Sequence, residues 1–329
     1  MLIPTFDHGP TLLPAIHSAL RQTETDVAVH VIGDGAPDST DLLMKQVTGS
    51  ERKVHYHPHA KSLRTGEPYR HELLQSVECD FVAYLSDDDI LAPDHVERVT
   101  EPLARGVDFA ATLTLLLGEG EPELMRVDLG DPSDRAMLLG SVNRITLSAA
   151  AHRWDSYLRL PFGWRTAPAD EWTDHWMWKQ WLAEPWVTAE SVPALTAIHV
   201  PRQYRDGMSN EEMAAANWEW VRRTSDEWWS LQRDAVLIAA ANTSSRLAEQ
   251  RLAEVLAVST QADATESALR ADLHVANERA DGLQAQSENA DTASRLAAQQ
   301  RDELLKSSTW RLTQPLRSCL DGLRRTRVR

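Results

Sequence analysis

Along the first two hundred residues, short apolar runs alternate with segments in which apolar side chains recur at helical spacing. Four apolar runs end in polar or turn residues, as buried parallel strands do, and they cover residues 2–5, 27–32, 54–57 and 81–85. Helical spacing lies between them, over residues 11–22, 39–47 and 68–77. This alternation predicts an α/β, Rossmann-like domain with a mostly parallel sheet and helices on both faces. In such sheets, ligands bind where the strands end at their carboxyl side.

The pattern changes after residue 200. No proline occurs between Pro201 and Pro315, and the glycines in that stretch are Gly207 and Gly282. Because proline breaks helix interiors, we expect a long helical tail here. A 3–4 spacing can be followed from residue 252 to 304, but most of its positions are alanine, serine or charged. A weak coiled coil, which would join copies of the chain into an oligomer, and an exposed single helix both fit this seam.

The last segment is basic and amphipathic. Its six arginines interleave with Trp310 and four leucines, against one acid, Asp321. Such a segment favours contact with an anionic membrane surface or with an acidic partner, for example a partner enzyme. We therefore expect three parts, which cover residues 1–210, 211–306 and 307–329.

Composition narrows the class of protein. The formal net charge of −15 argues against nucleic-acid binding, because neutralising phosphates needs a clustered positive surface. Cys79 and Cys319 form neither a disulfide framework nor a CxxC metal site, which fits a reducing cytosol. The first residues lack the pattern of a signal peptide, and no apolar run is long enough for a transmembrane helix. We therefore expect a cytoplasmic protein. Its basic last segment could also hold it at the inner face of the membrane as a peripheral protein.

Three adjacent carboxylates, Asp87, Asp88 and Asp89, directly follow the fourth apolar run. They repel one another and raise one another's pKa, so a folded protein keeps such a cluster mainly where a cation neutralises it. Mg²⁺ and Mn²⁺ take oxygen ligands and are often completed by substrate phosphates. The alternative is a solvated acidic turn that caps a helix beginning near Asp94.

Two earlier strand ends also carry oxygen ligands. Thr5 and Asp7 follow the first run, and Asp34 stands between two glycines after the second. Each could be an ordinary turn, but the carboxyl ends of parallel strands meet at one sheet edge. Arg70 could meet the charge of a diphosphate. Neither GxGxxG nor GxxxxGK[ST] occurs in the sequence. These motifs form the phosphate-binding loops of dinucleotide-binding proteins and of P-loop NTPases, so the sequence favours neither class.

The segments IPTFDHGPTLLPAIHSALRQT, VIGDGAPDST and FVAYLSDDDILAPDHVE resemble the successive blocks of bacterial family 2 glycosyltransferases, which usually read close to IPTYNR, VDDGSTD and LDxDD. The resemblance covers about residues 1–210 and implies an inverting enzyme with the A-type fold that uses a nucleotide-diphosphate sugar. It implies that the nucleotide-sugar contacts Thr5, Asp7, Asp34, Arg70, Asp87 and Asp88. It also implies that Mn²⁺ or Mg²⁺ is held by Asp87, Asp89 and His199.

The chain departs from these blocks at three positions. Asp7 stands where the family usually has asparagine, and Gly33 replaces the first aspartate of the second block. Ser86 occupies the usual first aspartate of the third block. That shift leaves the metal pair open between Asp87 with Asp89 and Asp88 with Asp89.

Inverting transfer needs a base that takes the proton of the acceptor hydroxyl. In the family this base is the aspartate of an ED-like block, and the best matching position here is Asp174, with Asp170 and Glu171 in reserve. An acidic first helical turn that favours the helix dipole is the alternative. His199 follows a late strand, where many A-type enzymes have a histidine near the metal or the diphosphate; a structural histidine is the alternative.

The resemblance implies a hexosyltransferase-like enzyme that moves a sugar to a saccharide or lipid-linked acceptor in cell-surface polysaccharide or glycoconjugate synthesis. Two other functions stay open from the residues alone. A metal-dependent phosphatase or phosphotransferase also places a DxD after an apolar strand, although near its first strand. A non-catalytic scaffold would use a degenerate domain to anchor the helical tail.

Overall fold

The computed structural model describes residues 1–118, 121–200, 207–225 and 227–306. The chain divides into two compact units, Met1–Glu249 and Gln250–Arg329. The predicted basic segment, residues 307–329, lies outside the described residues.

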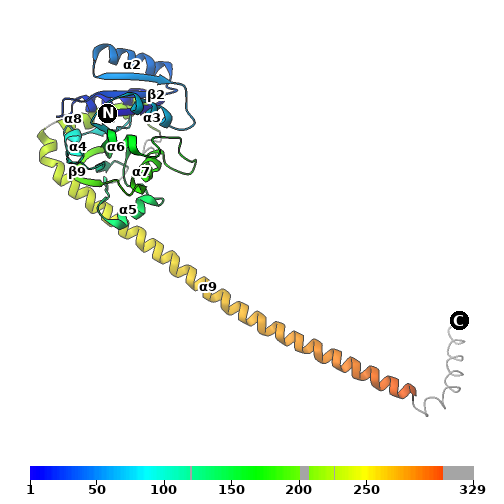
Figure 1. Ribbon diagram of the computed structural model, residues 1–329. Coiled ribbons are helices and arrows are strands. Elements are labelled where there is room, and N and C mark those ends of the chain that lie inside the picture. The colour runs from blue at the N-terminus through cyan, green and yellow to red at the C-terminus, as the bar shows by residue number, and fades with distance from the viewer. Residues whose placement is uncertain (119–120, 201–206, 226, 307–329) are drawn as a thin grey trace. The chain divides into compact units, whose positions relative to one another are not determined.

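The first half of the sheet is parallel. Its strands are β1 (Leu2–Thr5), β2 (Val29–Asp34) and β3 (Val54–His59), paired in the order β1-β2-β3. The helices of this half are α1 (Leu12–Leu20), α2 (Asp38–Ser50) and α3 (Glu67–Ser76), and α2 packs on β3 (Figure 1). The expected alternation of strand and helix is therefore present, with shifts of a few residues at the ends.

The second half of the sheet is mixed. Its strands follow the order β4-β8-β6-β9-β5, with β7 beside β6, and an isolated parallel bridge between Leu2 and Tyr84 links it to β1. β6 and β9 run parallel, whereas the other pairs are antiparallel. The strands are β4 (Phe81–Ala83), β5 (Ile90–Leu91), β6 (Phe109–Leu116), β7 (Glu123–Met125), β8 (Ala150–Arg153) and β9 (Ala189–His199). The helices that accompany these strands are α4 (His95–Ala104), α5 (Pro132–Leu139), η2 (Leu147–Ala149), α6 (Trp154–Arg159) and α7 (Thr173–Ala183), and a short helix of the first half, η1 (Gly9–Thr11), joins β1 to α1.

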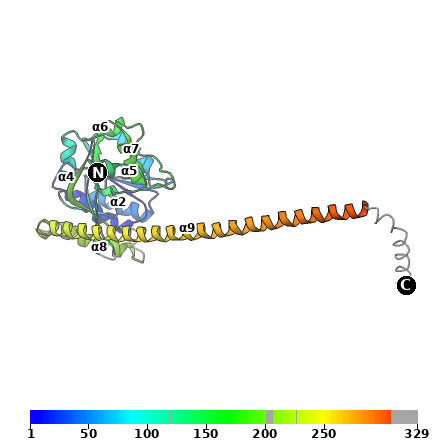
Figure 2. The same cartoon turned by 90° about the horizontal axis from the view of Figure 1, so that it is seen from below.

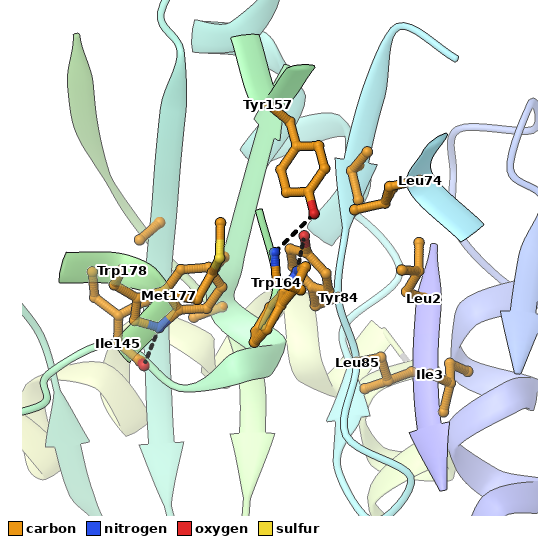
Figure 3. Close-up of a cluster of buried hydrophobic side chains, with 14 of the residues drawn as sticks. Leu2, Ile3, Leu74, Tyr84, Leu85, Ile145, Tyr157, Trp164, Met177 and Trp178 are labelled. Atoms are coloured by element: carbon orange, nitrogen blue, oxygen red, sulfur yellow. Dashed lines mark hydrogen bonds between the residues drawn. The ribbon is translucent and has the colours of Figure 1, made fainter. Parts of the chain in front are cut away.

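Large aromatic side chains fill the main core. Trp178, Trp181 and Tyr84 are fully buried and belong to one cluster with the aliphatic side chains of β1 and β2. Figure 3 shows Tyr84 and Trp178 in this cluster. Trp164 meets Tyr84 edge to face, and its indole N–H donates to the Tyr84 hydroxyl at 2.8 Å. Trp164 and Trp178, whose indole N–H also donates to the carbonyl of Ile145, therefore serve packing, because burial of a large ring with its N–H bonded contributes strongly to stability.

Two further helices follow β9: α8 (Asn210–Ser225) and α9 (Glu227–Lys306) (Figure 2). Val221, Trp229 and Ala240 join a second apolar cluster with Ile90 and Ile198. The first unit therefore extends to Glu249, beyond the boundary predicted at residue 210, because α8 and the first turns of α9 complete its core.

In the second unit, the structure describes a continuation of α9. Every side chain described from Gln250 onward is exposed. The long helix predicted for residues 211–306 is thus present as α8 and α9. Among the described residues, no helix is both long and apolar enough to cross a membrane.

Candidate functional site

Three strand ends meet at one edge of the sheet. In the parallel pair of β1 and β2, Thr5 lies opposite Gly33, so Asp34 follows at the same level. The bridge from Leu2 to Tyr84 aligns the segment after β4 with β1, and the acidic loop begins just beyond it. The fold therefore brings Thr5, Asp34 and Asp87 to one side, as the order of strands predicted.

A cluster of polar side chains forms around the buried Asp87. Thr5 Oγ1 donates to Asp87 Oδ2 at 2.6 Å, and His8 Nδ1 lies 2.8 Å from Asp87 Oδ1. His8 Nδ1 also lies 3.6 Å from Asp88 Oδ2. One ligand atom each from His8, Asp87 and Asp88 lies within 4.8 Å of the others. Two carboxylates and one imidazole form a donor set that suits Mn²⁺ and, through the oxygens, Mg²⁺.

Two carboxylates and one imidazole shift one another's pKa in this cluster. Burial, followed by the neighbouring charge of Asp88, raises the pKa of Asp87, although the bond to His8 opposes the rise. The hydrogen bond with Asp87 is the largest cause that raises the pKa of His8, to about 9. The His8 imidazolium therefore partly neutralises the pair of carboxylates, which is the task a divalent cation would take over.

Asp89 and His199 form a neighbouring pair. His199 Nδ1 lies 2.7 Å from Asp89 Oδ1, and Ser148 Oγ donates to Asp89 Oδ2 at 2.5 Å. The predicted metal ligands were Asp87, Asp89 and His199. In the structure, Asp87 and Asp89 lie on one loop and His199 lies at the end of the adjoining strand. The side chains that cluster with Asp87 are His8 and Asp88, whereas His199 contacts Asp89.

His8 was missed in the sequence analysis. It lies three residues beyond the end of β1, at the same edge as the acidic loop. That position was the available signal, because the turn after a first parallel strand faces the turn after the strand beside it.

Asp34 is buried and already has three internal bonds. Its carboxylate accepts from Lys61 Nζ at 2.6 Å and from the backbone N–H and Oγ of Ser62 at 2.6 and 3.0 Å. Lys61 Nζ also lies 5.0 Å from the centre of the exposed Phe6 ring. The Asp34 side chain thus anchors the segment after β3 and leaves little free capacity for a nucleotide. Asp7 is exposed, and its carbonyl accepts from Asn210 Nδ2 at 3.0 Å.

Gly33, which replaces the first aspartate of the family's second block, lies against a side chain of the neighbouring strand. A Cβ atom at Gly33 would stand 2.5 Å from the Tyr56 hydroxyl, which is bonded to Asp41. Tyr56 therefore occupies the space that the first aspartate of the block would need. The contact between position 33 and Tyr56 is seen only in the tertiary structure, because nothing in the residues adjacent to Gly33 in the sequence indicates it.

Arg70 is buried beside the candidate base. Its guanidinium donates to Thr65 O at 2.7 Å and lies 4.5 Å from the centre of the Trp164 ring. Burial is the largest cause that lowers the pKa of Arg70, while the charges of Glu67 and Asp174 raise it. A buried cation of this kind suits an anionic ligand.

Asp174 opens α7 and is half-buried. Its Oδ1 accepts the N–H of His175 at 2.8 Å, and its Oδ2 accepts from Asn143 Nδ2 at 3.2 Å. Burial raises the pKa of Asp174, and these two bonds oppose the rise. Glu171 is paired with Lys179 at 2.7 Å, and Asp170 is exposed. Asp174 is thus the carboxylate of this block with a shielded, oriented side chain, as a proton acceptor requires.

A family model described as Glycosyl transferase family 2 matches residues 1–141. No curated protein sequence matches the chain. Among solved structures, the chain is similar to S. aureus TarS, with 13% identity, 70% of this chain and 42% of that chain covered, and a TM-score of 0.45.

A second similar structure is S. aureus TarS 1–349 in complex with UDP-GlcNAc, with 13% identity, 70% and 71% covered, and a TM-score of 0.45. A third is the mannosyltransferase PcManGT from Pyrobaculum calidifontis in complex with GDP-Man and Mn²⁺. It shows 15% identity, 78% and 79% covered, and a TM-score of 0.46. The chain spans less than half of the length of the full TarS chain.

Proposed function

We propose, from the match of residues 1–141 to the model of glycosyl transferase family 2, that the protein transfers a sugar, with inversion, from a nucleotide-diphosphate sugar to a saccharide or lipid-linked acceptor. The observation that carries the proposal is the cluster of the buried Asp87 and Asp88 with the half-buried His8, at the sheet edge where Asp34 and Thr5 also lie. Repelling carboxylates of this kind fit a site that meets a cation and a diphosphate.

The donor set supports a requirement for Mn²⁺ or Mg²⁺. When bound, the cation would neutralise the negative charge that develops on the leaving diphosphate. The residues that would hold it are His8, Asp87 and Asp88, with Asp89 and His199 beside them. Arg70, buried and stacked on Trp164, would add a fixed positive charge toward the phosphates.

Asp174 is the group placed to accept a proton. As the acceptor oxygen forms a bond to the anomeric carbon, the bond from that carbon to the diphosphate oxygen breaks on the opposite face. The proton of the acceptor hydroxyl passes to the Asp174 carboxylate, which the raised pKa makes a better acceptor than an exposed aspartate. Attack from the face opposite the leaving group produces inversion at the anomeric carbon.

A nucleotide-sugar screen tests the function. The full chain with Mn²⁺ is incubated with UDP-, dTDP- and GDP-sugars, and release of nucleoside diphosphate is measured with and without EDTA. We expect release from at least one donor, loss of it in EDTA and in Asp87→Asn, and retention of it in the exposed control Asp38→Asn. Release of inorganic phosphate alone would support the phosphatase alternative. No release from any donor would contradict the proposal.

A further inference from the structure

Asp174 has a side-chain partner that comes from a different part of the chain. Asn143 lies in the loop between α5 and η2, and its Nδ2 donates to Asp174 Oδ2 at 3.2 Å. The other end of the same amide is occupied as well, because Asn143 Oδ1 accepts the N–H of Ile145 at 3.0 Å. A backbone N–H can only donate, so the amide oxygen must face Ile145 and the amide N–H₂ must face Asp174.

Two buried bonds hold this loop against the helix that carries Asp174. The Trp178 indole N–H donates to the carbonyl of Ile145 at 3.1 Å (Figure 3). One turn earlier on the same helix, His175 Nε2 donates to the carbonyl of Leu138, at the end of α5, at 2.7 Å. The anchors bracket Asn143 in the sequence, so the loop that presents its amide is fixed on α7 at both ends.

We propose that Asn143 is a positioning residue for Asp174, whose amide holds the carboxylate in one orientation for proton transfer. The inference rests on the proposed function, in which Asp174 is the base. Asp174 Oδ1 is directed by its own helix through the N–H of His175, and Oδ2 is directed by Asn143. With both oxygens directed, the carboxylate presents its remaining lone pairs in a defined direction, as efficient proton transfer requires.

The same bond also sets how readily Asp174 takes up a proton. Burial is the largest cause that raises the pKa of Asp174; the backbone bond from His175 and the bond from Asn143 lower it. The charged or titratable groups that face Asp174 are His175 on α7 and Arg70 on α3, and both lower its pKa. Because an amide N–H₂ bonds better to the carboxylate than to the acid, loss of Asn143 should raise the pKa further.

Two substitutions separate this role from a role in loop shape. Asn143→Ala removes both bonds of the amide. Asn143→Asp keeps an oxygen that can accept the N–H of Ile145, but it replaces the donor to Asp174 with a second carboxylate. Ser141→Ala, at an exposed position of the same loop, is the matched control.

The readout is the titration of Asp174 itself, in the full chain with aspartate labelled at the side-chain carboxyl with ¹³C. The resonance is assigned by its loss in Asp174→Asn. We expect the midpoint to move up by about one pH unit in Asn143→Ala and at least as far in Asn143→Asp. Ser141→Ala should leave it unchanged. An unchanged midpoint in both Asn143 variants overturns the inference, as does a shift in Asn143→Ala that Asn143→Asp fully restores.

Turnover distinguishes failure of this inference from failure of the proposed function. With the donor that the screen identifies, kcat should fall about tenfold or more in the Asn143 variants, with little change in KM for the donor. If Asp174→Asn abolishes turnover but both Asn143 variants keep the wild-type kcat, Asp174 is the base and Asn143 does not position it. If Asp174→Asn retains turnover, the assignment of the base itself is wrong.

Discussion

At the scale of single residues, burial and hydrogen bonding distinguish the three carboxylates at and before the start of α7. Asp170 is exposed and Glu171 is paired with Lys179, whereas Asp174 is half-buried with both oxygens bonded. Shielding raises the proton affinity of a carboxylate, and hydrogen bonds keep the charged form accessible near neutral pH. Asp174 combines these two conditions.

Replacement of Asp174 should therefore affect chemistry more than binding. We expect Asp174→Asn to lower kcat by about 10²–10⁴-fold and to leave donor affinity nearly intact, because a base acts in the transition state. In the wild type, activity should fall on acidification through the raised pKa of Asp174, that is, at higher pH than for an exposed aspartate. A kcat profile with pH checks this. The exposed control Asp170→Asn should behave like the wild type; a loss there instead would refute the assignment.

The imidazole of the metal site can also be tested by substitution. We expect His8→Ala to weaken Mn²⁺-dependent binding of UDP or dTDP by about tenfold or more, because His8 shares the ligand cluster with Asp87 and Asp88. His199→Ala should weaken it less, since His199 lies against Asp89. Calorimetry in Mn²⁺ and in EDTA measures both variants. A larger loss of binding in His199→Ala than in His8→Ala would instead support the metal ligands predicted from the sequence, Asp87, Asp89 and His199.

At the scale of elements, close packing between neighbours decides which residues a strand end can carry. β2 and β3 lie side by side, and the Tyr56 ring of β3 crosses the backbone of β2 at Gly33. The Tyr56 hydroxyl continues to Asp41 on α2. This contact ties two strands and a helix together, and a side chain at position 33 would have to displace the Tyr56 ring.

Gly33→Ala should destabilise the protein by about 1–3 kcal/mol, because its Cβ would overlap the Tyr56 hydroxyl. Tyr56→Phe in the same chain should recover part of that loss, since it removes the oxygen that lies nearest. Urea unfolding of the two single variants and the double variant measures the coupling. Strictly additive losses would show that the contact does not limit position 33.

At the scale of the whole molecule, the domain ends later than the strands and prolines suggest. The cluster of Ile90 and Ile198 is covered by Val221, Trp229 and Ala240 from α8 and α9. Removal of these helices would leave that apolar surface in water, at a cost of about 1.5–3 kcal/mol for each large side chain. The first unit therefore needs residues 211–249.

Truncation tests this boundary. A chain cut after Glu249 should unfold within a few degrees of the full chain, because every side chain described beyond it is exposed. A chain cut after Asn210 should unfold at a clearly lower temperature or aggregate, because the second cluster loses its cover. Thermal unfolding followed by circular dichroism compares them. Equal melting temperatures for both truncations would contradict the role of α8 and α9.

The basic end leads to a proposal about location. We propose that the six arginines and the leucines after residue 306 dock the chain on an anionic inner leaflet, which would bring it close to a lipid-linked acceptor. We expect the full chain to float with anionic liposomes, to be released in high salt, and to stop floating when cut after Lys306. If both chains stay in the soluble fraction at low salt, a protein partner becomes the better explanation of this segment.

The elements of the parallel half and the place of the acidic loop could be predicted from the amino-acid sequence alone. Apolar runs, helical spacing and prolines are local signals, so β1 was located at Leu2–Thr5 and the carboxylates of Asp87–Asp89 were expected at a sheet edge. The long helix was likewise expected from the absence of proline and scarcity of glycine. Short-range periodicity encodes such features because they depend on neighbours only a few residues away.

The tertiary structure alone decided the partners. His8 and Asp87 meet across 79 residues of sequence, and Asn143 and Asp174 across 31. The antiparallel pairs of the second half and the cover from α8 and α9 are likewise set by packing between distant segments. Such contacts depend on strand register and on the packing of helices against the sheet. A local pattern of hydrophobic and polar residues predicts neither the register nor the packing.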